Sequence, residues 1–416
     1  MKNVIIVGGG IIGLSSAFYL QRSGYRVTVI DKGDFSDNCS YGNAGYVCPS
    51  HFIPLATPGI VGQGLKWMLD SKSPFYIQPR LDWSLIEWGI QFIKSATNKK
   101  SEAAAVPLRD IALLSQHEYE SWTKLPDFDF SYEHKGLMEI FQTENKAEHA
   151  LHTVEKAKEL GLGVELLNKE ELQRMEPQTK INALGAIYFK CDSHLYPNQL
   201  MKVLLSYLKN KGVRFEPGQE LKQFESENSV VKKIITSRNS YHADEIVIAT
   251  GSWSREIASL FQTKLPLVPG RGYSITLEDS PYLLDHPAVL MEGRVAITPM
   301  AGNKIRFGGT MEITSTETPP RLKRVAGILD AVKKFFPEFD IRVPTQDKIW
   351  YGYRPCSADG LPYIGRIKKF KNVVIATGHS MLGLSLGAGT GKLVDEIING
   401  SPGSIDMVPY AVERFS

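Results

Sequence analysis

The chain is poor in cysteine, and the cysteines that it has form no pattern of their own. Four occur in 416 residues, at Cys39, Cys48, Cys191 and Cys356, and no two of them make a C-x-x-C pair. This spacing excludes a disulfide-rich secreted fold and argues against a cysteine metal site. We therefore expect a reducing compartment and no bound metal.

Long apolar runs, sequence repeats and a strong net charge are also absent. No run of about 18 apolar residues could span a bilayer. Lys2 precedes an apolar stretch, but glycines interrupt that stretch and no small-residue cleavage site follows it, which argues against a signal peptide. A formal net charge of +3 is too small to indicate a nucleic-acid partner. These absences predict a cytoplasmic protein that binds no nucleic acid.

What the chain does have is enough apolar sequence for a large core. Hydrophobic residues make up 43% of its 416 residues and charged residues 22%. This length is sufficient for two domains or for one large composite domain.

The N-terminal segment VIIVGGGIIGLSSAFYLQRSGYRVTVID has the pattern of a strand, a turn, a helix and a second strand. Gly8, Gly10 and Gly13 have the G-x-G-x-x-G spacing, which allows a tight turn, close approach of backbone N–H groups to a pyrophosphate, and packing of the helix on the strand. Asp31 ends the second strand, where a carboxylate can accept hydrogen bonds from a ribose. The alternative is a structural turn in another α/β domain, and the spacing alone does not separate FAD from NAD. The predicted contacts are Gly8, Gly10, Ile11, Ile12, Gly13, Asp31 and Lys32.

Further along the chain, apolar periodicity predicts helices and an antiparallel sheet. Helical patterns occupy residues 101–124, 145–160 and 197–211. Because helical patterns do not alternate regularly with the strand-like segments, we expect these to form an antiparallel sheet that interrupts the nucleotide-binding domain. The strand-like segments are residues 136–142, 185–189, 272–277, 295–300 and 304–313.

Two later segments are predicted to return to the nucleotide-binding domain. Residues 245–257 form a buried-strand pattern that ends in Thr250 and Gly251, and residues 372–400 form a strand, a glycine-rich turn and a closing helix. At Gly251, a cofactor contact and a simple end-of-strand turn are equal alternatives. In the second segment, glycines crowd a helix start, where a backbone without side chains can approach a ring or a phosphate. These glycines are Gly378, Gly383, Gly387, Gly389 and Gly391, and the predicted contacts are Gly378, Gly383 and Leu384.

Five segments together resemble a known family. They are the opening glycine motif, CSYGNAGYVCPSH (39–51), RGYSIT (271–276), YGYRPCSADGLPYIG (351–365) and ATGHSMLGLSLGAG (376–389). The chain is similar to the FAD-dependent amine oxidoreductases of the D-amino acid oxidase superfamily, and within it to the bacterial D-amino acid dehydrogenase group. The resemblance runs from end to end, with the motifs in the family order. It implies FAD rather than NAD, because in the family the last two segments wrap the flavin ring.

The resemblance also implies the fold. We expect an α/β chain (α+β overall) in which a Rossmann-like FAD-binding domain is interrupted by an antiparallel-sheet substrate domain. The expected FAD-binding domain comprises residues 1–55, 145–260 and 353–416. The expected substrate domain comprises residues 56–144 and 261–352.

The activity that the resemblance implies is oxidation of the Cα–N bond of a D-amino acid by noncovalently bound FAD. Hydride transfer from the α-carbon gives an imine and then a 2-oxo acid, and a cyclic substrate such as D-proline or hydroxyproline would leave a cyclic imine. The reaction needs the α-carbon fixed against the flavin and the carboxylate oriented. A quinone is the electron acceptor that we expect of a dehydrogenase.

Two alternatives stay open. One is an oxidase of the glycine or sarcosine type, which produces hydrogen peroxide. The other is a flavin-carrying subunit of a hetero-oligomeric dehydrogenase, and the sequence leaves the oligomeric state open.

Arg354 is predicted to bind the substrate carboxylate. It occupies the place of an arginine in the family motif, and a guanidinium fork matches a carboxylate bidentately. The alternative is a surface or domain-bridging arginine. Tyr273 and Tyr353 are candidate substrate contacts, with core packing as the alternative, and Arg271 is expected to face the flavin or the domain junction.

The segment SYGNAGYVCPSH resembles the family loop beside the flavin and its phosphates. His51 is a candidate at the active-site entrance, although an isolated histidine is commonly structural. The resemblance places His379, within TGHSMLG, near the flavin. The loop residues predicted to contact the cofactor are Ser40, Asn43, Ala44 and Gly45.

Residues 58–96 carry Trp67, Trp83 and Trp88 among aliphatic and basic residues. The favoured interpretation is a pair of core-facing helices. The alternative is peripheral contact with the inner face of a membrane, which would bring a dehydrogenase close to a quinone in the bilayer.

Overall fold

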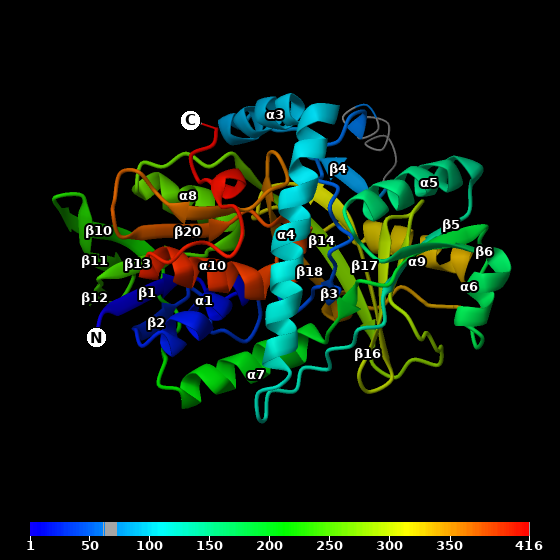
Figure 1. Cartoon of the computed structure of the whole chain (residues 1–416), viewed down its shortest axis with the longest axis horizontal. Helices are drawn as coiled ribbons and strands as arrows, with labels where there is room; N and C mark the ends of the chain where they lie inside the picture. Colours follow the sequence, from blue (N-terminus) through cyan, green and yellow to red (C-terminus); the bar gives the residue numbers. More distant parts are fainter. Residues whose placement is uncertain (61, 63–72, 416) are drawn as a thin grey trace.

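The N-terminal glycine motif belongs to a six-stranded sheet that is parallel except at one edge. The computed structural model describes residues 1–60, 62 and 73–415, and this sheet lies in the left half of Figure 1. Its central strands are apolar along their whole length, as expected of strands covered on both faces. In spatial order the strands are β19 (Tyr363–Arg366), β20 (Val373–Thr377), β13 (Glu245–Ile248), β1 (Asn3–Val7), β2 (Arg26–Ile30) and β9 (Arg214–Glu216), and β19 is the antiparallel one.

Helices cover one face of this sheet, and a small antiparallel sheet covers the other. Because side chains alternate along a strand, Val4 and Ile6 of β1 pack toward the helices. Ile5 and Val7 pack toward the small sheet. The helical layer comprises α1 (Ile11–Arg22), α4 (Asn98–Trp122), α7 (Pro197–Asn210) and α10 (Gly387–Asn399), and the opposite layer comprises β10 (Leu221–Glu227), β11 (Val230–Thr236), β12 (Ser240–His242) and α8 (Ser254–Leu260).

A nine-stranded sheet occupies the right half of Figure 1, beyond α4. Its pairing is antiparallel apart from two parallel pairs, β15 with β5 and β17 with β4. In spatial order the strands are β18 (Ile349–Ser357), β14 (Leu267–Leu277), β17 (Lys304–Ile313), β16 (Val295–Met300), β15 (Ala288–Leu290), β5 (Leu137–Phe141), β7 (Gly185–Phe189) and β6 (Val164–Asn168), with β4 (Phe75–Ile77) attached to β17.

Helices also support the large sheet. Phe307 and Ile297 on one face of the sheet pack against Val325 and Ile328 of α9. The opposite face is directed toward the six-stranded sheet, so the two sheets face a common space. The helices of this half are α3 (Trp83–Ser95), α5 (Glu144–Glu159), α6 (Lys169–Met175) and α9 (Lys323–Phe335), and β3 (Tyr46–Val47) pairs with β8 (Ser193–His194).

The predicted elements and the fold class are confirmed. The three expected helices are α4, α5 and α7, and the expected strands correspond to β5, β7, β14, β16 and β17. The antiparallel sheet interrupts the parallel one, as expected, because β13 and β20 return to lie beside β1.

The expected domain boundaries differ from the packing in two regions. Residues 56–144 were expected in the substrate domain, yet α4 packs in the helical layer of the parallel sheet. Residues 145–260 were expected in the FAD-binding domain, yet β6 and β7 pair with each other and β7 pairs with β5 in the large sheet. The physical reason is that β7 is buried on both sides by antiparallel partners, whereas residues 145–160 carry a helical pattern that suits either domain. Only from α7 onward does this stretch belong to the core of the parallel sheet.

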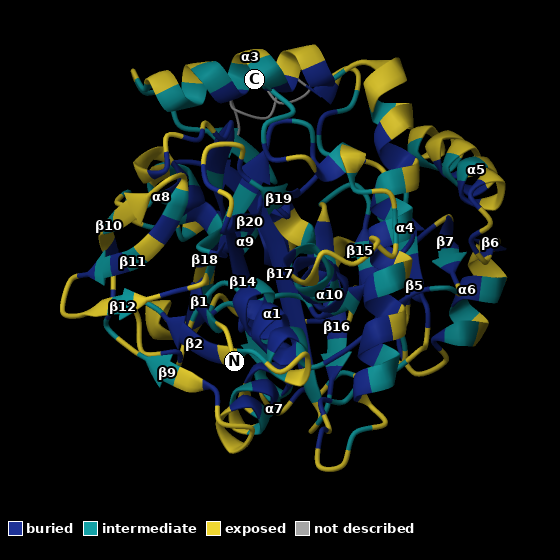
Figure 2. Cartoon of the chain, turned by 60° about the vertical axis from the view of Figure 1, so that its left-hand side comes forward, coloured by how far each residue is buried: buried dark blue, intermediate teal, exposed yellow. Residues whose placement is uncertain are grey.

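Helix α3 lies across the top of the molecule in Figure 2 and has an exposed outer side. Trp83, Ile86, Ile90 and Ile93 are exposed on it. Trp88 and Phe92 point inward and are buried, so the core-facing expectation holds for one side of the helix. Trp67 lies outside the described residues. Within the described ranges, no helix combines the length and the apolar character needed to cross a bilayer.

Candidate active site

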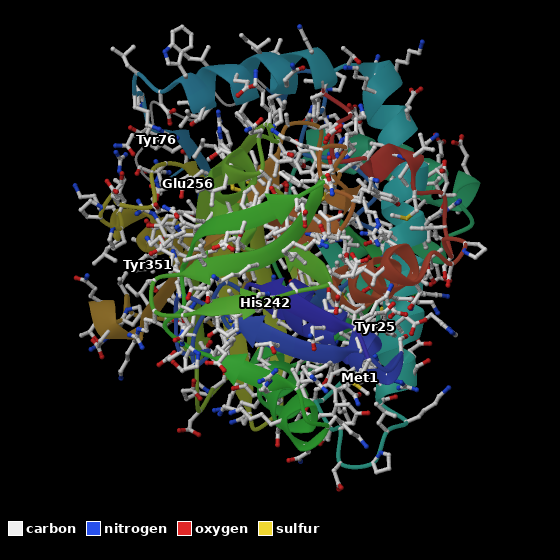
Figure 3. The ribbon with its side chains drawn as sticks, turned by 90° about the vertical axis from the view of Figure 1, so that its left-hand side faces the viewer. Met1, Tyr25, Tyr76, His242, Glu256 and Tyr351 are labelled. Carbon is white, nitrogen blue, oxygen red and sulfur yellow. The ribbon has the colours of Figure 1, made fainter. Side chains whose placement is uncertain are left out.

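A cavity of about 980 Å³ lies at the carboxyl ends of β1, β13 and β20 and continues over one face of the nine-stranded sheet. Ligands of open α/β sheets bind at such strand ends, and this volume matches a large ligand pocket. Glu256 and Tyr351, which both line the cavity, lie toward the same side of the molecule in Figure 3.

The glycine motif shapes one end of the cavity through backbone geometry. Gly8 has a φ of +113°, and a Cβ there would lie 2.3 Å from the carbonyl oxygen of Ala249. A Cβ on Gly13 would lie 1.9 Å from the carbonyl oxygen of Gly8, so α1 packs directly on the turn. Gly10 begins α1 without a side-chain cap, and Ile11 donates its backbone N–H to Ser40 Oγ at 3.0 Å. The partial positive charge of the α1 N-terminus therefore faces the cavity.

Asp31 organises the turn beside the motif. Its Oδ2 accepts from the backbone N–H of Gly9 at 2.6 Å, and its Oδ1 accepts from that of Gly33 at 2.7 Å. Each carboxylate oxygen keeps a lone pair for a further donor. Next to it, Lys32 Nζ lies 3.4 Å from the ring centroid of Trp253, a cation–π contact across the cavity wall. Burial lowers the pKa of Lys32 below its ordinary value.

The loop after β2 is held against both sheets. Asn43 Oδ1 accepts from the backbone N–H of Gly45 at 2.9 Å, and Arg306 of β17 donates to the carbonyl oxygens of Tyr41 and Asn43 at 2.8 and 2.7 Å. Gly45 adopts a φ of +87° because a Cβ would lie 2.2 Å from the carbonyl oxygen of Leu195. The loop is thus fixed from the large sheet while it lines the nucleotide end.

The ends of β13 and β20 lie side by side at the cavity. Thr377 Oγ1 donates to the carbonyl oxygen of Gly251 at 3.1 Å. Gly389 and Gly391 were expected to let the backbone approach a ring or a phosphate, but they serve helix packing instead. A Cβ on Gly389 would lie 2.9 Å from the backbone nitrogen of Ser115 in α4, and one on Gly391 would lie 2.5 Å from the backbone carbon of Ser15 in α1. These glycines let α10 pack tightly on two helices.

Arg354 on β18 is a cation that lines the cavity. Its Nη1 donates to the carbonyl oxygen of Thr310 at 2.5 Å, and among the described residues it makes no ion pair. Its guanidinium lies over Gly272, where a Cβ would come within 2.2 Å of Nη2. Burial lowers its pKa below the ordinary value. A buried guanidinium without a counterion is suited to an anionic ligand.

Arg271 and the two tyrosines differ from expectation. Arg271 is fully buried and pairs with Glu312 at 2.8 Å, on the face of the sheet opposite Arg354. Tyr273 donates its hydroxyl to the same carboxylate at 2.7 Å, and Tyr353 donates to the carbonyl oxygen of Thr316 at 2.8 Å. The tyrosine rings line the cavity, but both hydroxyls already have partners in the protein. Arg271 was expected to face the flavin or the domain junction; it does not line the cavity, which argues against the first of these.

Both predicted histidines line the cavity in neutral form. Burial lowers the pKa of His51 to about 4 and that of His379 to about 3. His379 Nε2 lies 3.0 Å from Thr390 Oγ1, whose own proton goes to the carbonyl oxygen of Leu386, so we assign the Nε2 proton to this bond. Its Nδ1 is buried without a partner in the described structure. Neither ring is a strong base at neutral pH.

Most of the predicted site residues are brought together, and three are not. Gly13, Gly45 and Gly378 do not line the cavity; they hold its walls, and a Cβ on Gly378 would lie 2.7 Å from the ring of Tyr363. Those that line it are Gly8, Gly10, Ile11, Ile12, Asp31, Lys32, Ser40, Asn43, Ala44, Thr250, Gly251, Gly383, Leu384, His51, Tyr273, Tyr353, Arg354 and His379.

Sequence reasoning missed several lining residues. Trp253, Trp350 and Arg294 line the cavity without belonging to a recognised motif. Trp253 lies two residues after Gly251 at the end of β13, and this strand end is the signal that could have found it. Cys48, His51 and Asp192 also lie within 4.8 Å of one another. Because Asp192 already accepts from the backbone N–H and Oγ of Ser50, this group carries no metal assignment, and the absence of a metal stays a prediction.

Comparison with known proteins agrees with this geometry. Residues 3–397 match the family described as FAD dependent oxidoreductase. The chain belongs to this family. The FAD-dependent oxidoreductase is 28% identical over 424 residues to a D-amino acid dehydrogenase from Granulibacter bethesdensis, which covers 99% of each chain. It is also 28% identical over 394 residues to a D-amino acid dehydrogenase from Helicobacter pylori, which covers 94% of each chain.

Solved structures show the same fold. Glycine oxidase from Geobacillus kaustophilus superposes with a TM-score of 0.78 at 21% identity and covers 100% of this chain and 99% of its own. L-proline dehydrogenase from P. horikoshii superposes with a TM-score of 0.73 at 19% identity and covers 100% of this chain and 97% of its own. The family resemblance and the FAD-binding fold inferred from the sequence are confirmed.

The residues present fit FAD. The close backbone approach at Gly8 and the uncapped start of α1 suit a pyrophosphate, and the free lone pairs of Asp31 suit ribose hydroxyls. The cavity continues from there to Arg354, so one ligand end can rest on the glycine motif while the other lies over the large sheet.

Proposed function

We propose that this FAD-dependent oxidoreductase oxidises the Cα–N bond of a D-amino acid to an imine, which water then converts to a 2-oxo acid. The observation that carries the proposal is Arg354, a half-buried arginine that lines the cavity and has no carboxylate partner among the described residues. The curated relatives are D-amino acid dehydrogenases, which supports the D-enantiomer.

The residues of the chain act by positioning rather than as strong bases. Arg354 would hold the substrate carboxylate bidentately, and Gly272 leaves room for that fork. His51 and His379 are too weakly basic to take the proton of the substrate ammonium. The amine would therefore lose that proton to solvent before hydride transfer, and no strong protein base is required. FAD, when bound, supplies the hydride acceptor. The predicted cofactor and substrate contacts, and the division into two domains, form part of this proposal.

The test is the anaerobic visible spectrum of the purified protein during addition of D- and L-amino acids, including proline, hydroxyproline and glycine. Bleaching of the flavin bands by a D-enantiomer is expected. A flavin spectrum that no amino acid bleaches contradicts the proposal and favours the partner-dependent subunit. Turnover by the purified single chain removes that alternative.

We propose a dehydrogenase with a quinone acceptor rather than an oxidase. The oxidase alternative is favoured by the structural likeness to glycine oxidase, and a cyclic substrate by the likeness to L-proline dehydrogenase. Peroxide formation at a rate similar to dye reduction would select the oxidase.

We infer that FAD is bound noncovalently. Cys39 and Cys48 line the cavity, and burial raises the pKa of Cys39 to about 11 and that of Cys48 well above its ordinary value. Covalent attachment through sulfur needs a reactive thiolate, and these thiols stay protonated. Acid precipitation should release the yellow colour into the supernatant; colour retained in the pellet overturns the inference.

We also propose that the outer face of α3 rests on a membrane surface. Trp83, Ile86, Ile90 and Ile93 follow one another at helical spacing and are exposed, Trp83 by 83%. Lys94 beyond them is exposed as well. A helix that is apolar on its outer as well as its inner face needs a cover, and an apolar face with a cation at its end fits an anionic lipid surface.

Cosedimentation with vesicles that contain phosphatidylglycerol tests this contact. The wild-type protein should pellet with the vesicles, and the Trp83→Ser, Ile90→Ser double variant should not. Leu260→Ser, at an exposed leucine of α8, is the matched control. Equal pelleting of all three proteins, or of none, contradicts the proposal.

A further inference from the structure

Arg294 is a second arginine at the substrate end of the cavity. It ends the turn between β15 and β16 and lines the cavity together with Ala296 of β16. Val295, between these two residues, is buried in the core against α9. Because alternate residues of a strand point to the same face, the side chain of Arg294 is directed to the cavity face.

The backbone of Arg294 and the guanidinium of Arg354 lie beside the same point of β17. A Cβ on Gly309 would lie 3.5 Å from the carbonyl oxygen of Arg294. The next residue, Thr310, accepts from Arg354 Nη1 at 2.5 Å. Because Gly309 and Thr310 are consecutive, the two arginines meet at one place in the cavity wall although they come from different strands.

The backbone at this place departs from regular strand geometry. Arg294 has a φ of +49° and Thr310 a φ of +66°. The register of β14 against β17 shifts at Thr310, as in a β-bulge. A left-handed conformation is unfavourable for these residue types and occurs chiefly at functional sites, and bulges next to active sites redirect side chains. The strain is therefore concentrated where the two arginines meet.

The substrate end of the cavity is positively charged. Of the lining residues that the structure describes, those from the large sheet and its turns include Arg294 and Arg354 but no aspartate or glutamate. The lining carboxylates come instead from the half with the six-stranded sheet. They are Asp31, Asp37, Glu220 and Glu256.

The surroundings of Arg294 add to this charge. Burial and, to a smaller extent, Arg294 lower the pKa of Lys146, while Glu292 and Glu139 act in the opposite sense. Glu292 is directed toward the start of α5, where its Oε1 accepts from the backbone N–H of Thr143 at 3.1 Å. Burial also lowers the pKa of Arg294, yet its side chain keeps exposed surface. A side chain that is surrounded by protein and still exposed faces the interior of an open cavity.

We propose that Arg294 is a specificity-determining residue that binds a carboxylate on the substrate side chain, so that acidic D-amino acids are the preferred substrates. The inference rests on the proposed D-amino acid oxidation and names its substrate class. Arg354 would hold the α-carboxylate and Arg294 the second carboxylate, since a guanidinium fork matches each of them.

The length of such a substrate suits two arginines at one place. In extended glutamate the two carboxylate carbons are about 5 Å apart, four C–C bonds along the chain. A hydrogen bond to a guanidinium adds about 2.8 Å at each end. A dicarboxylic amino acid can therefore bridge guanidinium groups that are about 10 Å apart.

The experiment compares matched substrate pairs on the holoenzyme. The pairs are D-aspartate with D-asparagine and D-glutamate with D-glutamine, whose members differ in charge and not in length. The variants are Arg294→Gln, which removes the charge, and Arg294→Lys, which keeps it. Arg174→Gln, at an exposed arginine of α6, is the control. The kcat/KM of each substrate and the flavin content of each variant are measured.

The wild-type enzyme should prefer the acid to the amide in at least one pair. In Arg294→Gln the kcat/KM of that acid should fall about 10- to 100-fold, while that of the amide changes by less than about threefold. Arg294→Lys should keep part of the preference, because an ammonium has the charge without the fork. The control variant should match the wild type.

Three outcomes overturn the inference. The first is a wild-type enzyme that oxidises the amides as fast as the acids in both pairs. The second is an acid-to-amide ratio that stays unchanged in Arg294→Gln; this ratio does not depend on how much of the preparation holds flavin. The third is an equal loss on both members of each pair, which would assign Arg294 to the cavity wall or to the cofactor.

Failure of the proposed function would give a different result. In that case the wild-type enzyme oxidises no amino acid at all. An enzyme that oxidises neutral D-amino acids without any preference for acidic ones supports the proposed function and overturns only the role of Arg294.

Discussion

The two ends of the cavity are built by different means. The nucleotide end is made of backbone: the turn at Gly8 and the uncapped start of α1. The substrate end is made of side chains from separate strands of the large sheet, with Arg354 on β18 and Tyr273 on β14. A backbone site depends on a few consecutive residues, whereas a side-chain site depends on how distant strands are paired.

Two arginines of the large sheet also show that a side-chain site depends on where each residue lies in the sheet. Arg354 and Arg271 lie on adjacent strands, yet Arg271 is neutralised by Glu312 on the far face, and Arg354 faces the cavity without a counterion. Because successive residues of a strand point to opposite faces, position along the strand decides which arginine can meet a substrate.

The largest expected effect concerns the backbone end. Gly8→Ala should abolish retention of FAD, because the new Cβ would lie 2.3 Å from the carbonyl oxygen of Ala249 at a φ of +113°; the strain and the clash together cost more than about 2 kcal/mol. The measurement is flavin absorbance of the purified protein after desalting. Gly24→Ala, at a glycine that also has a positive φ but open space around it, is the control and should retain FAD. Equal flavin content in Gly8→Ala and Gly24→Ala would contradict the prediction that the nucleotide end depends on the backbone at Gly8.

At the side-chain end, Arg354→Met should leave FAD bound and lower kcat/KM by about 10²- to 10³-fold, since the substrate carboxylate loses its charged partner. Arg354→Lys should be intermediate, because an ammonium lacks the planar fork. Steady-state kinetics on the best D-amino acid, with flavin content, provide the measurement. Arg342→Met, at an exposed arginine, should match the wild type. Loss of flavin with normal turnover per flavin would show that Arg354 serves the cofactor instead.

A smaller effect should appear in the pH dependence of stability. Burial lowers the pKa of His379 to about 3, so the unfolded chain takes up a proton near pH 6.5 while the folded chain does not. The stability that this neutral histidine contributes is complete above pH 6.5 and is lost progressively toward pH 3. Between pH 7 and 5 the loss is about 2 kcal/mol.

His379→Asn should remove this part of the acid sensitivity. Denaturant unfolding at pH 7 and pH 5 in saturating FAD provides the measurement. His152→Asn, at an exposed histidine of α5, is the control and should keep the wild-type difference between the two pH values. An unchanged difference in His379→Asn would mean that the histidine is protonated in the folded protein.

The smallest expected effect tests whether Tyr273 only lines the cavity or also binds the substrate. Tyr273→Phe should lower the free energy of unfolding by about 1–2 kcal/mol, because Glu312 loses one donor. Its kcat/KM should change by less than about twofold, since the hydroxyl points away from the cavity. Urea unfolding and steady-state kinetics check the two parts. A tenfold loss of kcat/KM at unchanged stability would restore Tyr273 as a substrate contact.

Much of the nucleotide end could be predicted from the sequence. The spacing of Gly8, Gly10 and Gly13, and the carboxylate of Asp31, are local features of one strand–turn–helix–strand unit, and the structure places them as expected. The late glycines misled the prediction because glycine also permits close helix packing. At Gly389 and Gly391 the backbone of α4 or α1, rather than a ligand, occupies the space.

The substrate end was only partly predictable. Arg354 was found through a family motif, whereas Arg294 lines the cavity from a segment without one. Arg271 was expected to face the flavin or the domain junction, and it does not line the cavity. The expected domain boundary at residue 145 differs from the strand pairing for a related reason. Strand β7 pairs with β5, and β6 pairs with β7, so both belong to the large sheet. Local periodicity shows that a segment is a strand and does not show beside which strand it lies.

The sequence by itself therefore determined the family, the nucleotide-binding turn and the presence of both sheets, because these follow from short-range spacing and apolar periodicity. Only the tertiary structure decided which charges remain free in the cavity. Arg271 pairs with Glu312, which also pairs with Arg324, whereas Arg354 has no carboxylate partner among the described residues. Sheet register causes this difference, because it brings residues that are far apart in the chain to one face or to opposite faces.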